Sequence, residues 1–200
     1  MTDWSVRGVN METREKILIA ARDVFGKKGF YETKMEDVAK EAGVAKGTLY
    51  LYFQSKEDLY QCLIKEGIKY FIQRLKEALE SQNSFEGKIR ALIKTLVLLI
   101  NENRDFILRM MYEIPLANLW NERIKSVIIE EQKEFARFVK DLFEDAIKQG
   151  IAYEGNVEVL SNAFVGMVMR PIFNSVIEGT LSESVEEEVF SIFKRAFIKK

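Results

Sequence analysis

The residues best suited to chemistry lie close together between positions 33 and 56. Small or cationic residues follow Gly43, namely Ala45, Lys46, Gly47 and Thr48. Small residues let a backbone approach the floor of a DNA groove, and Lys46 can reach a guanine or a phosphate. Other hydroxyl and ammonium groups nearby could donate to phosphates: Thr33, Lys34, Tyr50, Tyr52 and Lys56. Together these residues predict a surface that binds double-stranded DNA.

Two short helices are needed to hold these side chains. A T-x-x-E capping box at Thr33 and Glu36 predicts where the first begins. Gly43 can end it, because glycine tolerates a positive φ. The second helix is expected over residues 45–53, and the small Ala39 lets the two helices cross closely. Such a helix-turn-helix can place its second helix in the major groove, with its N-terminal residues facing the base edges.

Helical periodicity continues through the rest of the chain. Apolar residues at helical spacing predict a helix from Thr13 that ends at Gly29. A long helix is expected from Ser55 to about Glu80. Further helices are predicted around residues 89–100, 105–113, 121–149, 157–178 and 184–200.

The predicted fold class is all-α, because no alternating strand pattern is present and the chain has only 2 prolines. One of them, Pro171, lies inside a predicted helix and is expected to kink it. Residues 1–55 comprise an N-terminal arm, residues 1–12, and a three-helix helix-turn-helix DNA-binding domain. The long helix joins this domain to a larger helical bundle, residues 56–200.

Composition argues against most catalytic and metal sites. The chain has no histidine, which excludes Ser-His-Asp catalysis and His-ligated metals. Cys62 is the only cysteine, so a cysteine zinc site is excluded too. We therefore expect no catalytic residue, no metal and no cofactor, although catalysis by Lys, Tyr or Glu stays open.

Charge and hydropathy bear on partners and compartment. Residues 1–56 carry a net charge of +2 and residues 57–200 a net charge of −3, a small bias toward phosphate contact at the N-terminus. The longest apolar run, residues 96–100, is too short to span a membrane. No stretch has the pattern of a signal peptide. A cytoplasmic protein without a membrane partner is expected.

Two segments closely resemble the TetR family of transcriptional regulators. They are residues 29–33 and residues 38–59, which contain the pattern G-V-x-x-G-T-L-Y-x-Y-F-x-S-K-E-x-L. The resemblance covers about residues 13–65. Tyr52 departs from it, since many members have histidine there. The resemblance implies a homodimer, a ligand-sensing C-terminal domain in residues 56–200, and repression that a small molecule relieves.

Soft and aromatic side chains in the C-terminal region could line an apolar pocket. The candidates are Phe106, Met110, Tyr112, Glu113, Trp120, Phe164, Met167 and Arg170. Residues of these types also fill ordinary cores, so either role is open. Arg170 could meet an anionic ligand, a carboxylate of another subunit, or a carboxylate of its own chain.

The helices near residues 121–149 and 157–178 are candidates for the dimer contact, an assignment that the family resemblance implies. Apolar stripes on them comprise Phe135, Phe138, Leu142, Leu160, Phe164 and Val168. These stripes could instead face the core of their own subunit.

The leading hypothesis is a ligand-responsive transcriptional repressor that binds a palindromic operator as a dimer. A small apolar or amphipathic effector would release it by changing the separation of the two recognition helices, with the long helix as the link. The alternative is a constitutive DNA-binding or architectural protein without an effector, which a solid C-terminal core would favour. An enzyme with an appended DNA module is the third hypothesis.

Overall fold

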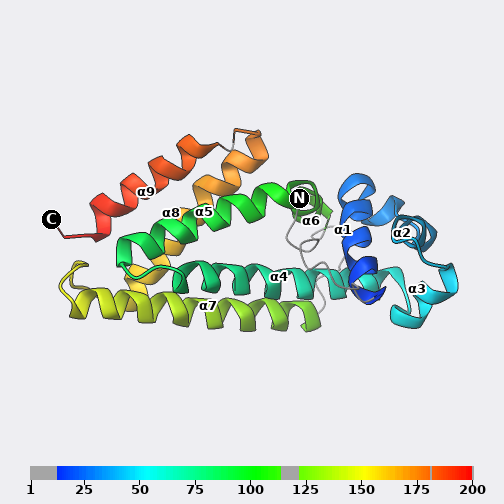
Figure 1. The fold of residues 1–200 in the computed structure, drawn as a ribbon, viewed down its shortest axis with the longest axis horizontal. Helices are drawn as coiled ribbons and strands as arrows, with labels where there is room; N and C mark the ends of the chain where they lie inside the picture. The colour runs from blue at the N-terminus through cyan, green and yellow to red at the C-terminus, as the bar shows by residue number, and fades with distance from the viewer. Residues whose placement is uncertain (1–12, 114–121, 181, 200) are drawn as a thin grey trace. The chain divides into compact units, whose positions relative to one another are not determined.

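The computed structural model describes residues 13–113, 122–180 and 182–199, which form nine α-helices (Figure 1). The all-α prediction is confirmed, and the predicted arm, residues 1–12, lies outside the described residues. In chain order the helices are α1 (Thr13–Glu32), α2 (Met35–Glu41), α3 (Lys46–Tyr52), α4 (Lys56–Glu80), α5 (Phe85–Glu102), α6 (Arg104–Glu113), α7 (Glu122–Lys148), α8 (Val157–Glu178) and α9 (Glu183–Phe197).

The helices group into two compact units. The first unit combines α1 to α3 and the start of α4, as far as Ile68, with α6, which packs against α1 and against Tyr60 of α4. The second unit combines residues 69–101 with residues from Ile129 onward. α4 therefore begins in the first unit and ends in the second. The predicted functional division at residue 55, where the α3–α4 turn lies, stays a prediction.

The core of the first unit is built on α1. Ile17, Ala21 and Phe25 are buried on one face of this helix, at the spacing that an amphipathic helix requires. The Phe25 ring packs edge-on against Tyr60 of α4, with 4.8 Å between the ring centroids. Phe106 of α6 meets the same tyrosine ring at 5.9 Å. α1, α4 and α6 thus share one apolar cluster.

Gly29 separates the body of α1 from its last residues. Its φ of 80° and ψ of 171° are not helical, and glycine adopts a positive φ without steric cost. The predicted helix end at this residue is thus confirmed as a change of backbone direction.

The core of the second unit is rich in phenylalanine. The Phe143 ring of α7 lies 5.6 Å from Phe85, 5.7 Å from Phe164 and 5.5 Å from Phe197 between centroids. Phe193 of α9 packs against Phe164 at 5.2 Å. Edge-to-face contacts of this kind add to the gain from burial alone.

Phe164 and Val168, which the sequence placed on a possible dimer stripe, are each only 1% exposed in this unit. They face the core of their own chain, which is the alternative that the stripe left open.

Backbone hydrogen bonds join the end of α9 to the α7–α8 connection. Ala152 and Ile198 form an antiparallel β-bridge. The Tyr153 amide donates to Phe197 O at 3.1 Å, and the Lys199 amide donates to Ile151 O at 2.8 Å. α9 begins at Glu183 after an N-cap at Ser182, one residue before the predicted start at residue 184. α8 runs through Pro171.

Candidate DNA-binding surface

α2 and α3 form the predicted helix-turn-helix. Between them Gly43 has a φ of 66°, and the Val44 amide donates to Ala39 O at 3.0 Å, which closes the turn. A Cβ at Gly43 would meet no atom within 4 Å. The backbone conformation, rather than crowding, therefore favours glycine at this position.

Leu49 and Phe53 anchor the recognition helix, because they are only 0% and 2% exposed in the core of the first unit. Leu49 lies within α3 and Phe53 is its C-cap, whose amide donates to Leu49 O at 3.0 Å. Most of the predicted DNA contacts on α3 and its N-cap are open to another molecule: Ala45, Lys46, Gly47, Tyr50 and Tyr52 are exposed, and Thr48 is half-buried.

Gly47 and Leu51 lie on the side of α3 away from Leu49. A Cβ at Gly47 would meet no atom of the protein within 4 Å, so internal packing does not require glycine there. Leu51, which the sequence prediction missed, is 85% exposed. Its spacing of four residues from Gly47, on the face opposite Leu49, is the pattern that could have identified it. An apolar side chain so exposed could contact a thymine methyl group.

Lys46 is the cation at the leading end of α3. Its ammonium forms an ion pair with the Glu36 carboxylate of α2 and lies 5.9 Å from the centroid of the Tyr50 ring. The hydrogen bond with Glu36 is the largest cause that raises the pKa of Lys46, and it also lowers the pKa of Glu36. Both groups are therefore charged at neutral pH.

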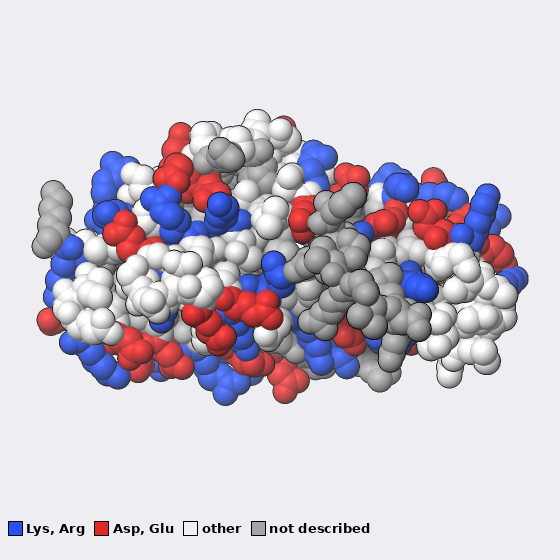
Figure 2. Space-filling model, in the orientation of Figure 1, with Lys and Arg blue, Asp and Glu red and all other residues white. Residues whose placement is uncertain are grey.

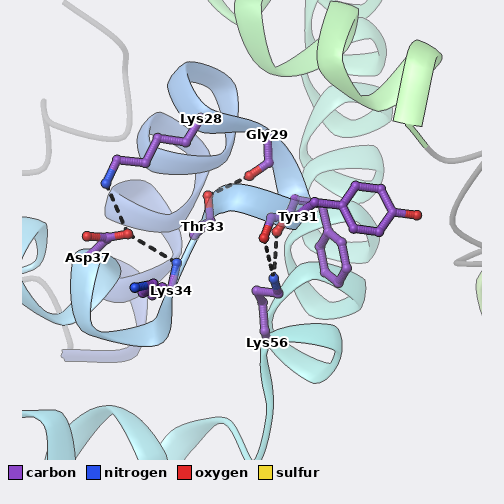
Figure 3. Close-up of polar contacts among 8 residues, drawn as sticks. Lys28, Gly29, Tyr31, Thr33, Lys34, Asp37 and Lys56 are labelled. Carbon is purple, nitrogen blue, oxygen red and sulfur yellow. Dashed lines mark hydrogen bonds and ion pairs between the residues drawn. The ribbon is translucent and has the colours of Figure 1, made fainter.

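Thr33 and Lys34 shape the start of α2 (Figure 3). The Thr33 side chain is buried, and its hydroxyl donates to Gly29 O at 2.6 Å. The Lys34 amide donates to the Asp37 carboxylate at 3.1 Å, and the Lys28 ammonium lies 3.0 Å from the same carboxylate. The hydrogen bond from the Lys34 amide is the main cause that lowers the pKa of Asp37.

The predicted capping box of Thr33 and Glu36 is therefore wrong by one residue. The Thr33 hydroxyl bonds back to α1, so α2 begins at Met35 and Asp37 closes the box. A phosphate contact by Thr33 or Lys34 stays a prediction.

Lys56 joins the end of α1 to the start of α4, as Figure 3 shows. Its ammonium donates to Phe30 O at 2.7 Å and to Tyr31 O at 3.2 Å, and it lies 4.5 Å from the centroid of the Phe30 ring. Two of its three N–H donors are thereby used inside the protein. Lys56 positions α1 and α4, and its predicted phosphate contact stays a prediction.

On the face shown in Figure 2, blue and red side chains alternate over much of the surface, without one large basic area. Two ion pairs show the same balance at the helix-turn-helix, because the acids in the first turn of α2 neutralise Lys28 and Lys46. The surface could meet DNA through individual contacts, with little help from a large net charge.

The predicted pocket residues are divided between the two units and the residues outside the description. Phe106 and Met110 are half-buried against the core of the first unit. In the second unit, Phe164 is buried, Met167 is half-buried and Arg170 is exposed. The side chains of Tyr112, Glu113 and Trp120 lie outside the described residues. The ligand pocket thus stays a prediction.

Other chemistry finds little support in the part of the chain that is described. There, no group of three His, Cys, Asp or Glu side chains could hold a metal ion. The Cys62 thiol accepts a hydrogen bond from the Arg14 guanidinium at 2.9 Å, and burial raises its pKa, which makes it a weak nucleophile. None of the helices searched is long and apolar enough to cross a membrane.

Comparison with known proteins places this geometry in a family. Residues 17–63 match the family model of bacterial regulatory proteins, tetR family. The chain is 33% identical over 186 residues to the uncharacterized HTH-type transcriptional regulator YvdT of Bacillus subtilis, and the match covers 91% of this chain and 93% of YvdT. It is 29% identical over 140 residues to the fatty acid metabolism regulator protein of the same organism, covering 70% of this chain and 71% of that protein.

A solved structure supports the fold. The transcriptional regulator FadR from Bacillus subtilis in complex with stearoyl-CoA has a TM-score of 0.71 and 24% identity, over 88% of this chain and 95% of that one. The matched segment, residues 17–63, holds the buried anchors of α3 and the turn at Gly43. The chain belongs to the TetR family of transcriptional regulators.

Proposed function

We propose that the protein is a ligand-responsive repressor that binds a palindromic operator as a homodimer and is released by a small apolar or amphipathic effector. This proposal rests on α3. Buried Leu49 and Phe53 hold this helix against the core, while Tyr50, Leu51 and Tyr52 are exposed. A helix so held can enter a major groove without losing its own packing. The protein would act in the cytoplasm, where its DNA is.

Separate roles follow for the residues of the surface. Ala45, Gly47 and Thr48 let the backbone approach the groove floor, while Lys46 and Leu51 reach base edges. The hydroxyl groups of Tyr50 and Tyr52 donate hydrogen bonds to phosphates, and the Lys34 ammonium donates to a phosphate as a cation. Thr33 and Lys56 act mainly by holding the ends of α1, α2 and α4 in place.

The exposed face of α8 supports a homodimer. Ala163 and Gly166 are exposed on this helix, and a Cβ at Gly166 would meet no atom within 4 Å. Ile177, one of the large apolar side chains of the same helix, is 44% exposed. Exposed small and apolar residues on one helix suit close packing against a second copy. Two recognition helices would then lie one DNA turn apart, ~34–36 Å.

α6 offers a route for regulation besides α4. A Cβ at Gly26 of α1 would lie 3.2 Å from the Phe106 amide nitrogen, so the two helices are in close backbone contact. The Arg109 guanidinium also donates to Lys27 O at 3.5 Å. α6 follows α5 after one residue, Asn103. An effector that shifts α5 or α4 would therefore move α1, and with it the helix-turn-helix.

The effector class is suggested by the relatives. Because one relative is a fatty acid metabolism regulator and the FadR structure contains stearoyl-CoA, an acyl-CoA is the first compound to test.

The deciding experiment is selection from a library of duplex DNA at two salt concentrations, followed by titration with stearoyl-CoA. We expect a palindromic site, at least tenfold weaker binding by Lys46→Ala and Tyr50→Ala, and loss of binding when the effector is added. Lys148→Ala, which removes an exposed lysine of the second unit, is the matched control. Selective binding that no acyl-CoA or other amphipathic compound alters would favour the constitutive DNA-binding alternative.

A further inference from the structure

Glu36 places a negative charge on the surface that is proposed to bind DNA. It lies in the first turn of α2, and its carboxylate is paired with Lys46, the first residue of α3. The two side chains are 54% and 57% exposed, so both are open to an approaching duplex. A carboxylate at this place repels phosphates and also occupies the cation that the proposed function assigns to DNA.

We propose that Glu36 raises the specificity of DNA binding by retaining Lys46 until α3 is fully inserted in the major groove. The inference rests on the proposed function, since it concerns how the same surface distinguishes an operator from other DNA. Glu36 is in this sense a positioning residue, because it acts on DNA through Lys46.

The physical reason lies in what each kind of complex can offer. Binding to unrelated DNA depends almost entirely on phosphate attraction and the release of counterions. Transfer of Lys46 from the Glu36 carboxylate to a phosphate exchanges one ion pair for another, releases few ions and leaves Glu36 beside the DNA. On unrelated DNA that exchange is therefore unfavourable, whereas an operator offers base contacts to α3, Lys46 included.

The neighbouring acid, Asp37, shows why the effect belongs to Glu36. Asp37 also pairs with a lysine, Lys28, but its carboxylate accepts the Lys34 amide and so closes the start of α2. The Glu36 carboxylate does not accept the Lys34 amide, and its main partner is Lys46. Replacement of Glu36 by glutamine should leave α2 intact while it removes the charge, because glutamine is about as good a helix former as glutamate.

The test compares Glu36→Gln with the wild type and with Glu41→Gln, a matched control. Glu41 is the last residue of α2, is exposed, and forms no ion pair among the described residues. Each full-length protein is titrated against the selected operator and against an unrelated duplex of equal length, at several salt concentrations. Circular dichroism confirms that each variant is folded.

We expect Glu36→Gln to bind the unrelated duplex about fivefold more tightly and the operator about twofold more tightly, so that specificity falls. The salt dependence on unrelated DNA should steepen by about 0.9 in log Kd per log salt, the value for one more phosphate neutralised. In a Lys46→Gln background the same substitution should leave the salt dependence unchanged, because the released cation is absent.

The inference is overturned if Glu36→Gln and Glu41→Gln change the specificity and the salt dependence equally. It is also overturned if the steepening persists without Lys46, since a general charge effect would then suffice. A wild-type protein that selects no duplex would overturn the proposed function itself, and this inference with it. A selective wild type with equal glutamine variants would overturn the inference alone.

Discussion

The exposed face of α3 and the phenylalanine core of the second unit use large side chains for opposite purposes. Leu51 and Tyr50 are 85% and 42% exposed on α3, whereas Phe143 and Phe193 are 0% exposed. Burial of an aromatic ring contributes to the stability of this protein, while exposure leaves its contact free energy for another molecule. Stability and recognition therefore depend on separate sets of residues, so each can be changed without the other.

The strongest test of this separation is Phe143→Ala. The ring lies at the centre of the phenylalanine cluster, so we expect the free energy of unfolding to fall by about 3–5 kcal/mol. Urea denaturation measures this loss. Leu98→Ala, at a side chain 49% exposed on α5, should change stability by about 0.5 kcal/mol or less. Equal losses in the two variants would contradict the packing described for Phe143.

A sharper test uses two leucines of the same helix. Leu49 is 0% exposed and Leu51 is 85% exposed, two residues apart on α3. Leu49→Ala should lower the free energy of unfolding by about 2–4 kcal/mol. Leu51→Ala should leave it within about 0.5 kcal/mol and weaken operator binding instead. Thermal denaturation and a DNA titration of both variants measure the two effects. If both variants lose stability and DNA affinity to the same extent, the two faces of α3 do not have separate roles.

Lys56 is expected to affect both stability and DNA binding. Lys56→Met keeps the length of the side chain but removes the donors to Phe30 O and Tyr31 O, so stability should fall by about 1–2 kcal/mol. DNA affinity should fall only indirectly, through displacement of the start of α4 and the end of α1. Chemical denaturation and DNA titration separate these effects. If the variant is as stable as the wild type, Lys56 does not hold α1 and α4 together, and a direct phosphate contact becomes the better explanation of its role.

The smallest effect concerns pH. The pKa of Asp37 in the folded protein is below its usual value of 3.8, mainly because of the hydrogen bond from the Lys34 amide. The charged carboxylate thus stabilises the fold above pH 3.8, and this contribution is lost as the pH falls through the lower folded pKa. Asp37→Asn should reduce the loss of stability in that acid range. An unchanged slope of thermal stability against pH, measured in acid, would exclude Asp37 as its source.

How far the sequence predicted these two regions depends on the distance between contacting residues. The helix-turn-helix follows from local rules: Gly43 favours a turn, and apolar Leu49 and Phe53 recur one helical turn apart in the sequence. The same spacing places Leu51 on the side away from Leu49, but this exposed leucine was not predicted. The start of α2 was predicted one residue early, because the Thr33 hydroxyl bonds back to Gly29 and Asp37 closes the cap.

Contacts between distant residues could not be predicted from one sequence. The bond from Lys56 to Phe30 O crosses 26 residues, and nothing in either segment identifies the other. The same limit applied to Phe164, since a helical stripe shows which side chains share a face but not what that face meets. Only the fold placed this ring beside Phe143 and Phe193.

The bridge between the α7–α8 connection and the end of α9 has a consequence for sequence drift. Its bonds use main-chain atoms only, from Ile151 to Tyr153 on one side and Phe197 to Lys199 on the other. Exposed side chains there, such as Tyr153, can therefore vary between relatives while the two segments stay joined. The exception is proline at position 153 or 199, because its nitrogen carries no hydrogen to donate. An alignment of relatives should show wide variety at both positions and a lack of proline.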